Sequence, residues 1–389
     1  MTEFYRDTWV EVNLDAIEEN VRNMRQHVPK DTQIMAVVKA DGYGHGAVQT
    51  AEVALRSGAT WLGVALLDEA LALRKSGIMA PILVLGYTRP EDAWIAAEKH
   101  ISLTVYQPEW IERASEMYKG EAPIFLHLKI DTGMGRIGVR TKEELADLVK
   151  ALETDRRMRA EGVFTHFATA DENDPTYFQR QYQRFTEMVD FLQTQNVNPN
   201  LVHCGNSAAS LKYPDKMFNM IRFGIAMYGL SPSTEMKPQL PFPLKEAFSL
   251  YSRLIHVKQI EAAESVGYGA TYTAEEATWV GTIPIGYADG WLRALSGKDS
   301  VLIQGKRFPV IGRICMDQMM VRLDRCYSPG EKVTLIGRDQ NAHISCDEIA
   351  GYLNTINYEV TCMISKRVPR LYLKNGEIIH TSNPVLGQL

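Results

Sequence analysis

One lysine stands where an apolar run gives way to a glycine-rich loop. The run Ile34–Val38 is followed directly by Lys39, and the loop after it carries Tyr43 and His45. Consecutive bulky apolar residues are typical of a parallel strand buried on both faces, so the lysine leaves a rigid support. A primary amine in such a place can form a Schiff base with an aldehyde when its surroundings favour the neutral form. The alternative is an ordinary solvated lysine at the end of a strand.

Length and composition indicate a cytoplasmic enzyme or binding protein with two domains. The chain has 389 residues, more than the roughly 250–300 that one hydrophobic core serves. Its net charge of −5 provides no basic field for nucleic acid or anionic lipid. We expect no membrane contact, because the sequence has no apolar segment long enough to span a bilayer and its N-terminus does not resemble a signal peptide. The five cysteines form no C-x-x-C pair, so we expect reduced thiols and no metal site: Cys204, Cys315, Cys326, Cys346 and Cys362.

The first part of the chain alternates between short apolar runs and helix-like stretches. The apolar runs are 34–38, 61–65, 82–85, 101–105, 124–130, 162–165, 201–203 and 220–223. This rhythm predicts a (β/α)₈ TIM-type barrel of the α/β class. A doubly wound open sheet is the competing architecture.

A segment rich in Pro and Ser, 231–243, separates this part from a region of short β-branched and aromatic runs. We therefore predict a barrel domain at 1–243 and a mostly β domain at 244–389. Within the second domain, 345–353 is expected to form a short helix and 360–364 a strand. The first strand, 8–13, is expected to pack with the second domain.

Unusual polar residues follow the predicted barrel strands. They are Lys39 after the first strand, Lys129 and Arg136 at the fifth, His166 after the sixth, Asn206 and Ser207 after the seventh, and Arg222 with Gly224 at the eighth. The carboxyl ends of barrel strands converge on one face, where active sites are built. The loops after strands seven and eight commonly bind phosphate there.

The segment 133–138 matches G-x-G-x-x-G and follows an apolar strand, which is the context of a dinucleotide site. The match lies at the fifth unit, however, and the next strand ends in His166 where an acidic residue is expected. Arg136 within the loop suggests contact with a different anion. We therefore disfavour a dinucleotide.

The polar residues that follow the predicted barrel strands suit pyridoxal phosphate. This cofactor requires an amine, a phosphate cradle and a partner for its ring nitrogen. Lys39 supplies the amine, and Arg222 can face the ring nitrogen. Candidates for the cradle are Tyr43, Ser207, Gly224 and Ile225.

The sequence resembles the alanine racemase family, the fold-type III pyridoxal-phosphate enzymes, over essentially its whole length. In the first domain the matching stretches are AVVKADGYGHG (36–46), DTGMGRIG (131–138), THFATAD (165–171), NSAAS (206–210) and RFGIAMYGLSPS (222–233). In the second domain they are GYGATYTA (267–274), IGYADGW (285–291), GRICMDQMM (312–320), TINYEV (355–360) and RVPR (367–370). Asp41-Gly42 stands where many members carry Asn-Ala.

The resemblance implies a homodimer whose two active sites are shared between subunits. Lys39 would bind the cofactor and act as one base, and Tyr268 would be the opposite base in the partner's site. Since tyrosine is a poor base at neutral pH, His166 and Arg222 are expected to assist it.

The resemblance assigns further roles. Arg136 would lie near the ring hydroxyl and the substrate carboxylate, with Lys129 carbamylated to hold it. Met316 would bind the substrate carboxylate through its amide, and Tyr287 would line the entrance. His166, Asn206 and Tyr358 would help to bind the cofactor, Tyr358 at its phosphate.

The expected activity is therefore interconversion of L- and D-alanine, an isomerase reaction that supplies D-alanine for peptidoglycan. Two alternatives remain: a sister enzyme on the same fold, either a racemase of serine or of broader specificity or a decarboxylase, and a non-catalytic pyridoxal-phosphate carrier. Decarboxylation needs no base on the opposite face, so Tyr268 argues against a decarboxylase. The carrier class resembles only the barrel half, so the β domain with Tyr268 argues against it.

Overall fold

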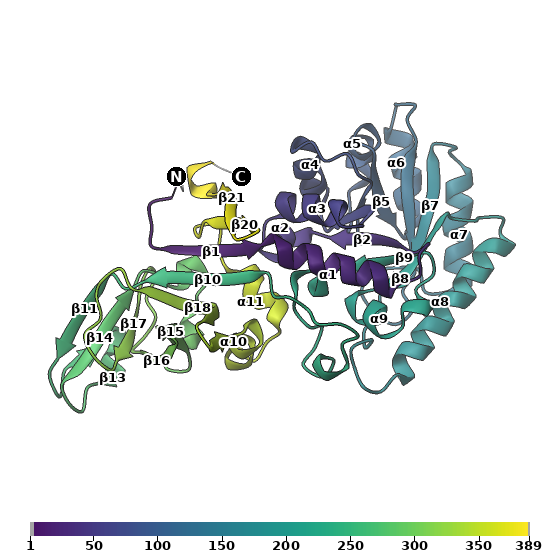
Figure 1. The fold of residues 1–389 in the computed structure, drawn as a ribbon. Helices are drawn as coiled ribbons and strands as arrows, with labels where there is room; N and C mark the ends of the chain where they lie inside the picture. The colour runs from purple at the N-terminus through teal and green to yellow at the C-terminus, as the bar shows by residue number, and fades with distance from the viewer. Residues whose placement is uncertain (1–3, 388–389) are drawn as a thin grey trace. The chain divides into compact units, whose positions relative to one another are not determined.

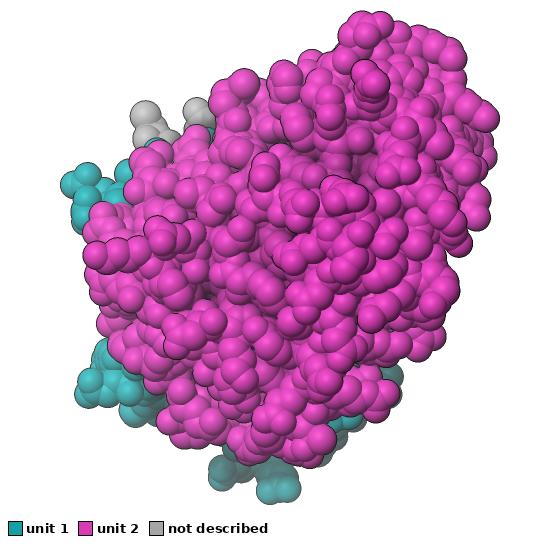
Figure 2. Space-filling view, turned by 90° about the vertical axis from the view of Figure 1, so that its right-hand side faces the viewer, with its two compact units in different colours: residues 1–16, 43–46, 246–389 teal, residues 17–42, 47–245 magenta. Residues whose placement is uncertain are grey.

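The computed structural model describes residues 4–387, and the chain divides into two compact units. The barrel unit consists of residues 17–42 and 47–245. The β unit consists of the described residues up to Ala16, residues 43–46, and the residues from Glu246 onward. The two units are coloured separately in Figure 2.

Eight strands of the barrel unit form a closed barrel, and the pairs given by the register are parallel (Figure 1). The strands are β2 (Gln33–Val37), β3 (Trp61–Val64), β4 (Ile82–Val84), β5 (Ile101–Val105), β6 (Ile124–Lys129), β7 (Met158–Phe164), β8 (Leu201–Gly205) and β9 (Met220–Phe223). Pairing of β9 with β2 closes the ring. The predicted barrel is confirmed, and the open doubly wound sheet is excluded.

One helix precedes the first barrel strand and the others follow barrel strands, and these helices cover the outside of the barrel (Figure 1). They are α1 (Leu14–His27), α3 (Ala47–Arg56), α4 (Leu67–Lys75), α5 (Ala93–Glu98), α6 (Pro108–Met117), α7 (Lys142–Glu153), α8 (Thr176–Thr194) and α9 (Ser207–Lys212). Local sequence explains their positions: Thr141 caps α7 by accepting a hydrogen bond from the Glu144 amide, and α8 buries Phe178, Phe185 and Leu192 along one face.

Strand residues alternate between the helices and the interior of the barrel, which is why both sides are apolar. Met35, Trp61, Leu83, Leu201 and Met220 form one buried cluster. The interior also contains polar side chains, including His127 and His203, which are completely buried.

The β unit is built on an 11-stranded sheet. Its strands are β1 (Thr8–Asn13), β10 (Phe248–Arg253), β11 (His256–Ile260), β14 (Thr278–Ile283), β15 (Ser300–Ile303), β16 (Lys306–Ile311), β17 (Met319–Leu323), β18 (Lys332–Asp339), β19 (Ala342–Ile344), β20 (Arg370–Lys374) and β21 (Glu377–Ser382). The N-terminal strand β1 pairs antiparallel with β10 and parallel with β20. A separate two-stranded sheet joins β12 (Ser265–Val266) to β13 (Tyr272–Thr273).

Two helices of the β unit show where the sequence was informative and where it misled. The helix predicted near 345–353 is α10 (Cys346–Leu353). The strand predicted at 360–364 is wrong, because α11 (Asn357–Met363) occupies this segment. Its buried residues Asn357, Val360 and Thr361 have helical spacing, which the β-branched content of the run obscured.

Single-turn 3₁₀ helices complete the described chain: η1 (Pro90–Asp92), η2 (Pro214–Lys216), η3 (Ile225–Tyr228), η4 (Lys237–Gln239), η5 (Tyr268–Ala270), η6 (Tyr287–Asp289), η7 (Arg293–Leu295) and η8 (Pro384–Leu386). None of the helices within residues 4–387 is long and apolar enough to cross a membrane. All five cysteines are free thiols.

Gly46 should be intolerant of any side chain. Its φ is +97°, and a Cβ atom built there would lie 1.8 Å from the hydroxyl oxygen of Tyr372. We predict that Gly46→Ala lowers the free energy of unfolding by about 2 kcal/mol more than Gly77→Ala does, measured by urea denaturation. Gly77 is the matched control, since its φ is +86° and a Cβ there meets nothing within 4 Å. Equal losses in the two variants would contradict the clash.

Candidate active site

Lys39 lies immediately after β2, in a turn held by two carboxylates. The turn α2 (Lys39–Tyr43) has left-handed backbone at Ala40 and Asp41, with φ of 53° at both. Glu69 accepts hydrogen bonds from the amides of Ala40 (2.6 Å) and Ala65 (2.7 Å), which ties the turn to the loop after β3. Asp41 accepts from the amide of Ala47 at 3.0 Å. The carboxylates thus stabilise a conformation that non-glycine residues rarely adopt, and they fix the origin of the lysine side chain.

Arg222 is buried inside the barrel and held from several sides. Its Nη2 donates to the backbone oxygens of Thr165 (2.7 Å) and Cys204 (3.1 Å) and to His166 Nδ1 (3.3 Å). Its Nη1 donates to His203 Nδ1 at 2.9 Å. Burial lowers the pKa of Arg222 to about 10, so the guanidinium remains charged at neutral pH. These partners are neutral, so they orient the guanidinium without cancelling its charge.

Lys129 ends β6 and is also buried, with Nζ 4.1 Å from the centroid of the Phe164 ring. Burial, together with the charges of Arg222 and Arg136, holds the pKa of Lys129 well below its usual range. Contact with the ring favours the charged amine by about 0.5–2 kcal/mol. Burial beside two arginines outweighs that contact, so the surroundings favour the uncharged amine more than water does around an exposed lysine.

His166 follows β7 and belongs to the same cluster. Burial lowers its pKa well below the usual range, and the charges of Arg222, Lys129, Arg136 and Lys39 lower it further. The imidazole is therefore neutral. Since Arg222 can only donate, Nδ1 of His166 accepts and its proton resides on Nε2.

The carboxyl ends of the barrel strands therefore concentrate positive charge. The negative group that acts on Lys129 is Asp131, and its Oδ1 already accepts the amides of Gly133 and Gly135, each at 3.0 Å. Cations gathered in this way with so little opposing charge make a site for an anionic ligand.

The loops after β8 and β9 meet through Ser207. Its Oγ accepts hydrogen bonds from the amides of Gly224 (3.0 Å) and Ala226 (3.4 Å), which brings the hydroxyl to the start of η3 at Ile225. Asn206 caps α9 by accepting from the Ala209 amide at 2.9 Å. The arrangement places the Ser207 hydroxyl at the first turn of η3, and hydroxyl groups and backbone amides at such a turn are donors that bind phosphate.

The segment 133–138 is folded around Asp131 and does not open a helix. The Asp131 carboxylate accepts hydrogen bonds from the amides of Gly133 and Gly135, and Tyr177 donates its hydroxyl hydrogen to Gly133 O at 2.7 Å. The next helix, α7, begins only at Lys142 with its own Thr141 cap. This geometry lacks the glycine-turn-to-helix junction of a dinucleotide site.

The remaining predicted site residues belong to the β unit. Tyr43 and Tyr358 lie together, with ring centroids 6.2 Å apart, and burial raises the pKa of Tyr43. Tyr268, on η5, is 68% exposed, and Met316 is 53% exposed. Tyr287, on η6, is 40% exposed; its amide donates to Cys315 O and that of Ala288 to Met316 O, both at 3.0 Å. Tyr287 and Met316 are thus held in adjacent turns.

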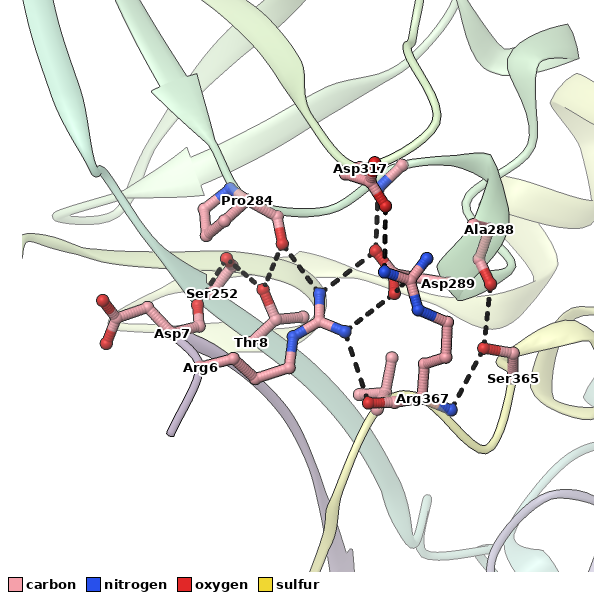
Figure 3. Close-up of polar contacts among 12 residues, drawn as sticks. Arg6, Asp7, Thr8, Ser252, Pro284, Ala288, Asp289, Asp317, Ser365 and Arg367 are labelled. Carbon is pink, nitrogen blue, oxygen red and sulfur yellow. Dashed lines mark hydrogen bonds and ion pairs between the residues drawn. The ribbon is translucent and has the colours of Figure 1, made fainter. Parts of the chain in front are cut away.

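A completely buried carboxylate, Asp289, fixes these turns (Figure 3). Arg6 binds it in a bidentate manner, at 2.7 and 3.1 Å, and Asp289 Oδ2 accepts from the Gly286 amide at 3.1 Å. Arg367 lies 3.7 Å from Asp289 and donates to Asp317 at 2.9 Å. The exposed tyrosine and methionine therefore project from a rigid base.

The structure brings together the predicted charged residues of the barrel unit. In the β unit it brings Tyr43 to Tyr358 and places Tyr287 and Met316 in adjacent turns. Within residues 4–387, no group of three His, Cys, Asp or Glu side chains is arranged to bind a metal ion. Sequence reasoning missed Glu69, His203 and Asp289. His203 could have been found, because it is a polar residue at an inward-facing position of a strand.

Comparison with known proteins agrees with this architecture. The family model for the alanine racemase N-terminal domain matches residues 12–232, and that for the C-terminal domain matches 247–372. An alanine racemase from Geobacillus stearothermophilus is 57% identical over 385 residues, covering 99% of this chain and 98% of the relative. The crystal structure of an alanine racemase from Bacillus anthracis, with bound L-Ala-P, has a TM-score of 0.97 at 48% identity and covers 98% of this chain and 99% of that one. A histidine racemase from Leuconostoc mesenteroides has a TM-score of 0.88 at 31% identity, covering 96% of this chain and 100% of that one.

Fold and comparisons define an isomerase of the amino-acid racemase class, built from a parallel barrel and a β domain. The chain belongs to the alanine racemase family. Members of this family depend on pyridoxal phosphate.

Loss of the Asp289 charge should destabilise the β unit, because Arg6 and the Gly286 amide would lose their partner. We predict that Asp289→Asn lowers the free energy of unfolding by about 2 kcal/mol, less than for a fully buried pair because both arginines are partly exposed. Asp317→Asn is the control, with an exposed carboxylate and an expected loss below about 0.5 kcal/mol. Urea denaturation gives both values, and indistinguishable losses would refute the role of Asp289.

Proposed function

We propose that this protein interconverts L-alanine and D-alanine with bound pyridoxal phosphate, in the cytoplasm, supplying D-alanine for peptidoglycan. The observation that supports this most strongly is the set of cationic groups around Lys39 at the carboxyl ends of the barrel strands. An anionic aldehyde cofactor matches both the charge of this site and its amine.

The residues present fit the cofactor. Lys39 would attach its aldehyde, and Arg222 would face its ring nitrogen. Arg136 would lie near the ring hydroxyl, with His166 and Asn206 completing the wall of the site. The proposed phosphate cradle consists of Tyr43, Ser207, Gly224, Ile225 and Tyr358. When bound, pyridoxal phosphate supplies an electron sink that makes the α-proton of an amino acid acidic.

Two side chains would exchange the α-proton on opposite faces of the substrate. The Lys39 amine accepts or returns the proton on one face, and the Tyr268 hydroxyl does so on the other. Arg222 does not release a proton, so it would face the ring nitrogen as a hydrogen-bond donor and leave that nitrogen uncharged, which would moderate the electron sink. A moderate electron sink would favour return of the α-proton by Lys39 or Tyr268 over side reactions.

The proposed functional unit is a homodimer. Tyr268, Tyr287 and Met316 are large side chains with substantial exposure in the single chain, which suits residues that a partner subunit would cover. In this proposal the barrel domain, residues 1–243, binds the cofactor. The β domain, residues 244–389, contributes Tyr268, Tyr287 and the Met316 amide to the partner's site.

The proposal also states which amino acid is the substrate. The similarity to a histidine racemase means that a related fold can serve a larger side chain, so racemisation of another amino acid is the second candidate. Alanine is favoured by the higher identity to alanine racemases over nearly the full chain.

The proposal predicts deuterium incorporation at the α-carbon as D-alanine accumulates from L-alanine in deuterated water, followed by NMR. Lys39→Ala should be inactive, and Tyr268→Phe should lose at least about 100-fold in rate because one acid-base group is gone. Tyr5→Phe, which alters an exposed tyrosine elsewhere, serves as the control. A parent protein that binds cofactor but racemises serine or histidine faster than alanine would favour the second candidate.

Lys129 should react with carbon dioxide, because burial beside Arg222 and Arg136 favours its uncharged, nucleophilic amine and a carbamate would place negative charge among the surrounding cations. After equilibration with ¹³C-bicarbonate at pH 7.5, we predict a carbamate carbon signal in the ¹³C NMR spectrum that disappears in Lys129→Ala. The signal should remain in Lys142→Ala, which alters an exposed lysine. A signal that survives Lys129→Ala, or its absence from the parent, would overturn the assignment.

A further inference from the structure

A row of polar side chains crosses the interior of the barrel beneath Arg222. Arg222 Nη1 lies 2.9 Å from His203 Nδ1, and His203 Nε2 lies 2.9 Å from His127 Nδ1. His127 Nε2 lies 3.2 Å from Glu161 Oε2, to which Ser102 Oγ also donates at 2.5 Å. The row thus links β9, β8, β6, β7 and β5.

Hydrogen-bond chemistry gives this row one direction. A guanidinium only donates, so Nδ1 of His203 must accept and its proton must reside on Nε2. That proton is donated to Nδ1 of His127, whose own proton is then on Nε2 and is donated to Glu161. Each imidazole is consequently neutral and in a defined tautomer, and the chain runs from the Arg222 cation to the Glu161 carboxylate.

Packing and burial support this assignment. His127 and His203 are completely buried, and burial near Arg222 lowers the pKa of both. The Phe164 ring stacks on His203 with centroids 4.7 Å apart, and Trp61 contacts His127 edge-on at 5.7 Å. The aromatic walls hold the imidazoles in the plane that the hydrogen bonds require.

The far end of the row opens to solvent at the amino ends of the strands. The side chain of Glu161 is 21% exposed and lines a groove of about 550 Å³ together with Glu121, Arg156, Arg157 and Arg159. The carboxylate therefore retains partial solvation and nearby positive charge, so the negative end of the row can persist inside a protein.

We propose that His203, His127 and Glu161 are positioning residues that fix Arg222 and polarise it from the opposite end of the barrel. The proposal rests on the proposed function only in placing Arg222 at the ring nitrogen of the cofactor. A carboxylate directly on Arg222 would cancel its charge. A carboxylate relayed through two neutral imidazoles strengthens the acceptor at His203 and orients the guanidinium while leaving its charge in the site.

The first test reads the tautomers directly, without any activity. In the full-length protein with ¹⁵N-labelled histidine, NMR should show His203 and His127 neutral and protonated on Nε2 between pH 6.5 and pH 9. Assignment uses His203→Gln and His127→Gln. A proton on Nδ1 of either ring, or an imidazolium at pH 7.5, would overturn the relay whatever reaction the protein catalyses.

The second test measures coupling along the row. Glu161→Gln keeps an acceptor but removes the charge, and it should lower kcat about tenfold with little change in KM, whereas Glu121→Gln in the same groove should have no effect. In a His127→Phe background, Glu161→Gln should add little further loss, because the connection is already broken. Equal kcat values for Glu161→Gln and Glu121→Gln would contradict the proposal. So would a double variant, His127→Phe with Glu161→Gln, whose loss in kcat is the product of the two single losses.

If His127→Phe does not fold, His127→Gln takes its place, since it removes the second imidazole nitrogen that the relay needs. Failure of both tests with normal alanine racemisation would refute the relay alone. The expected tautomers in a protein that does not racemise alanine would instead refute the proposed function and leave the relay intact.

Discussion

The structure depends on one electrostatic constraint, which is the burial of several cations at the carboxyl ends of the barrel strands. Arg222 and Lys129 are both buried and both contact the Phe164 ring, and their charges also act on His166. Uncompensated buried charge is costly, so these groups persist only if the protein supplies dipoles and a ligand supplies negative charge. Backbone oxygens of Thr165 and Cys204 and neutral imidazoles provide the dipoles.

The fold meets this constraint by assigning rigid elements to the charged groups. Arg222 lies on a strand, Lys129 ends a strand, and Lys39 stands in a turn that Glu69 stabilises. In the β unit, the Arg6–Asp289 pair provides a similarly rigid base for turns that leave Tyr287 and Met316 exposed. A two-base racemase needs such positioning, because small displacements of a proton donor greatly reduce the rate.

Much of the fold was predictable because buried parallel strands produce continuous apolar runs, and each run from 34–38 to 220–223 became a barrel strand. The polar residues after the strands were predictable for the same reason.

The prediction of a strand at 360–364 was wrong because the β-branched residues of this segment face a core at helical spacing. The left-handed Ala40 and Asp41 could not be foreseen, since Glu69, distant in sequence, stabilises that backbone. The pairing of His127 with His203 likewise depends on the barrel closing, which no local pattern encodes.

The claim that each site combines one subunit's barrel with its partner's β domain can be tested by subunit mixing. Lys39→Ala and Tyr268→Phe chains, carrying different affinity tags, would be co-expressed and the mixed dimer isolated through both tags. Because one of its two sites would receive an intact Lys39 and an intact Tyr268, the account predicts about half of the parental alanine racemase activity. A mixed dimer no more active than either variant alone would show that each site is built within one chain, and would contradict the account.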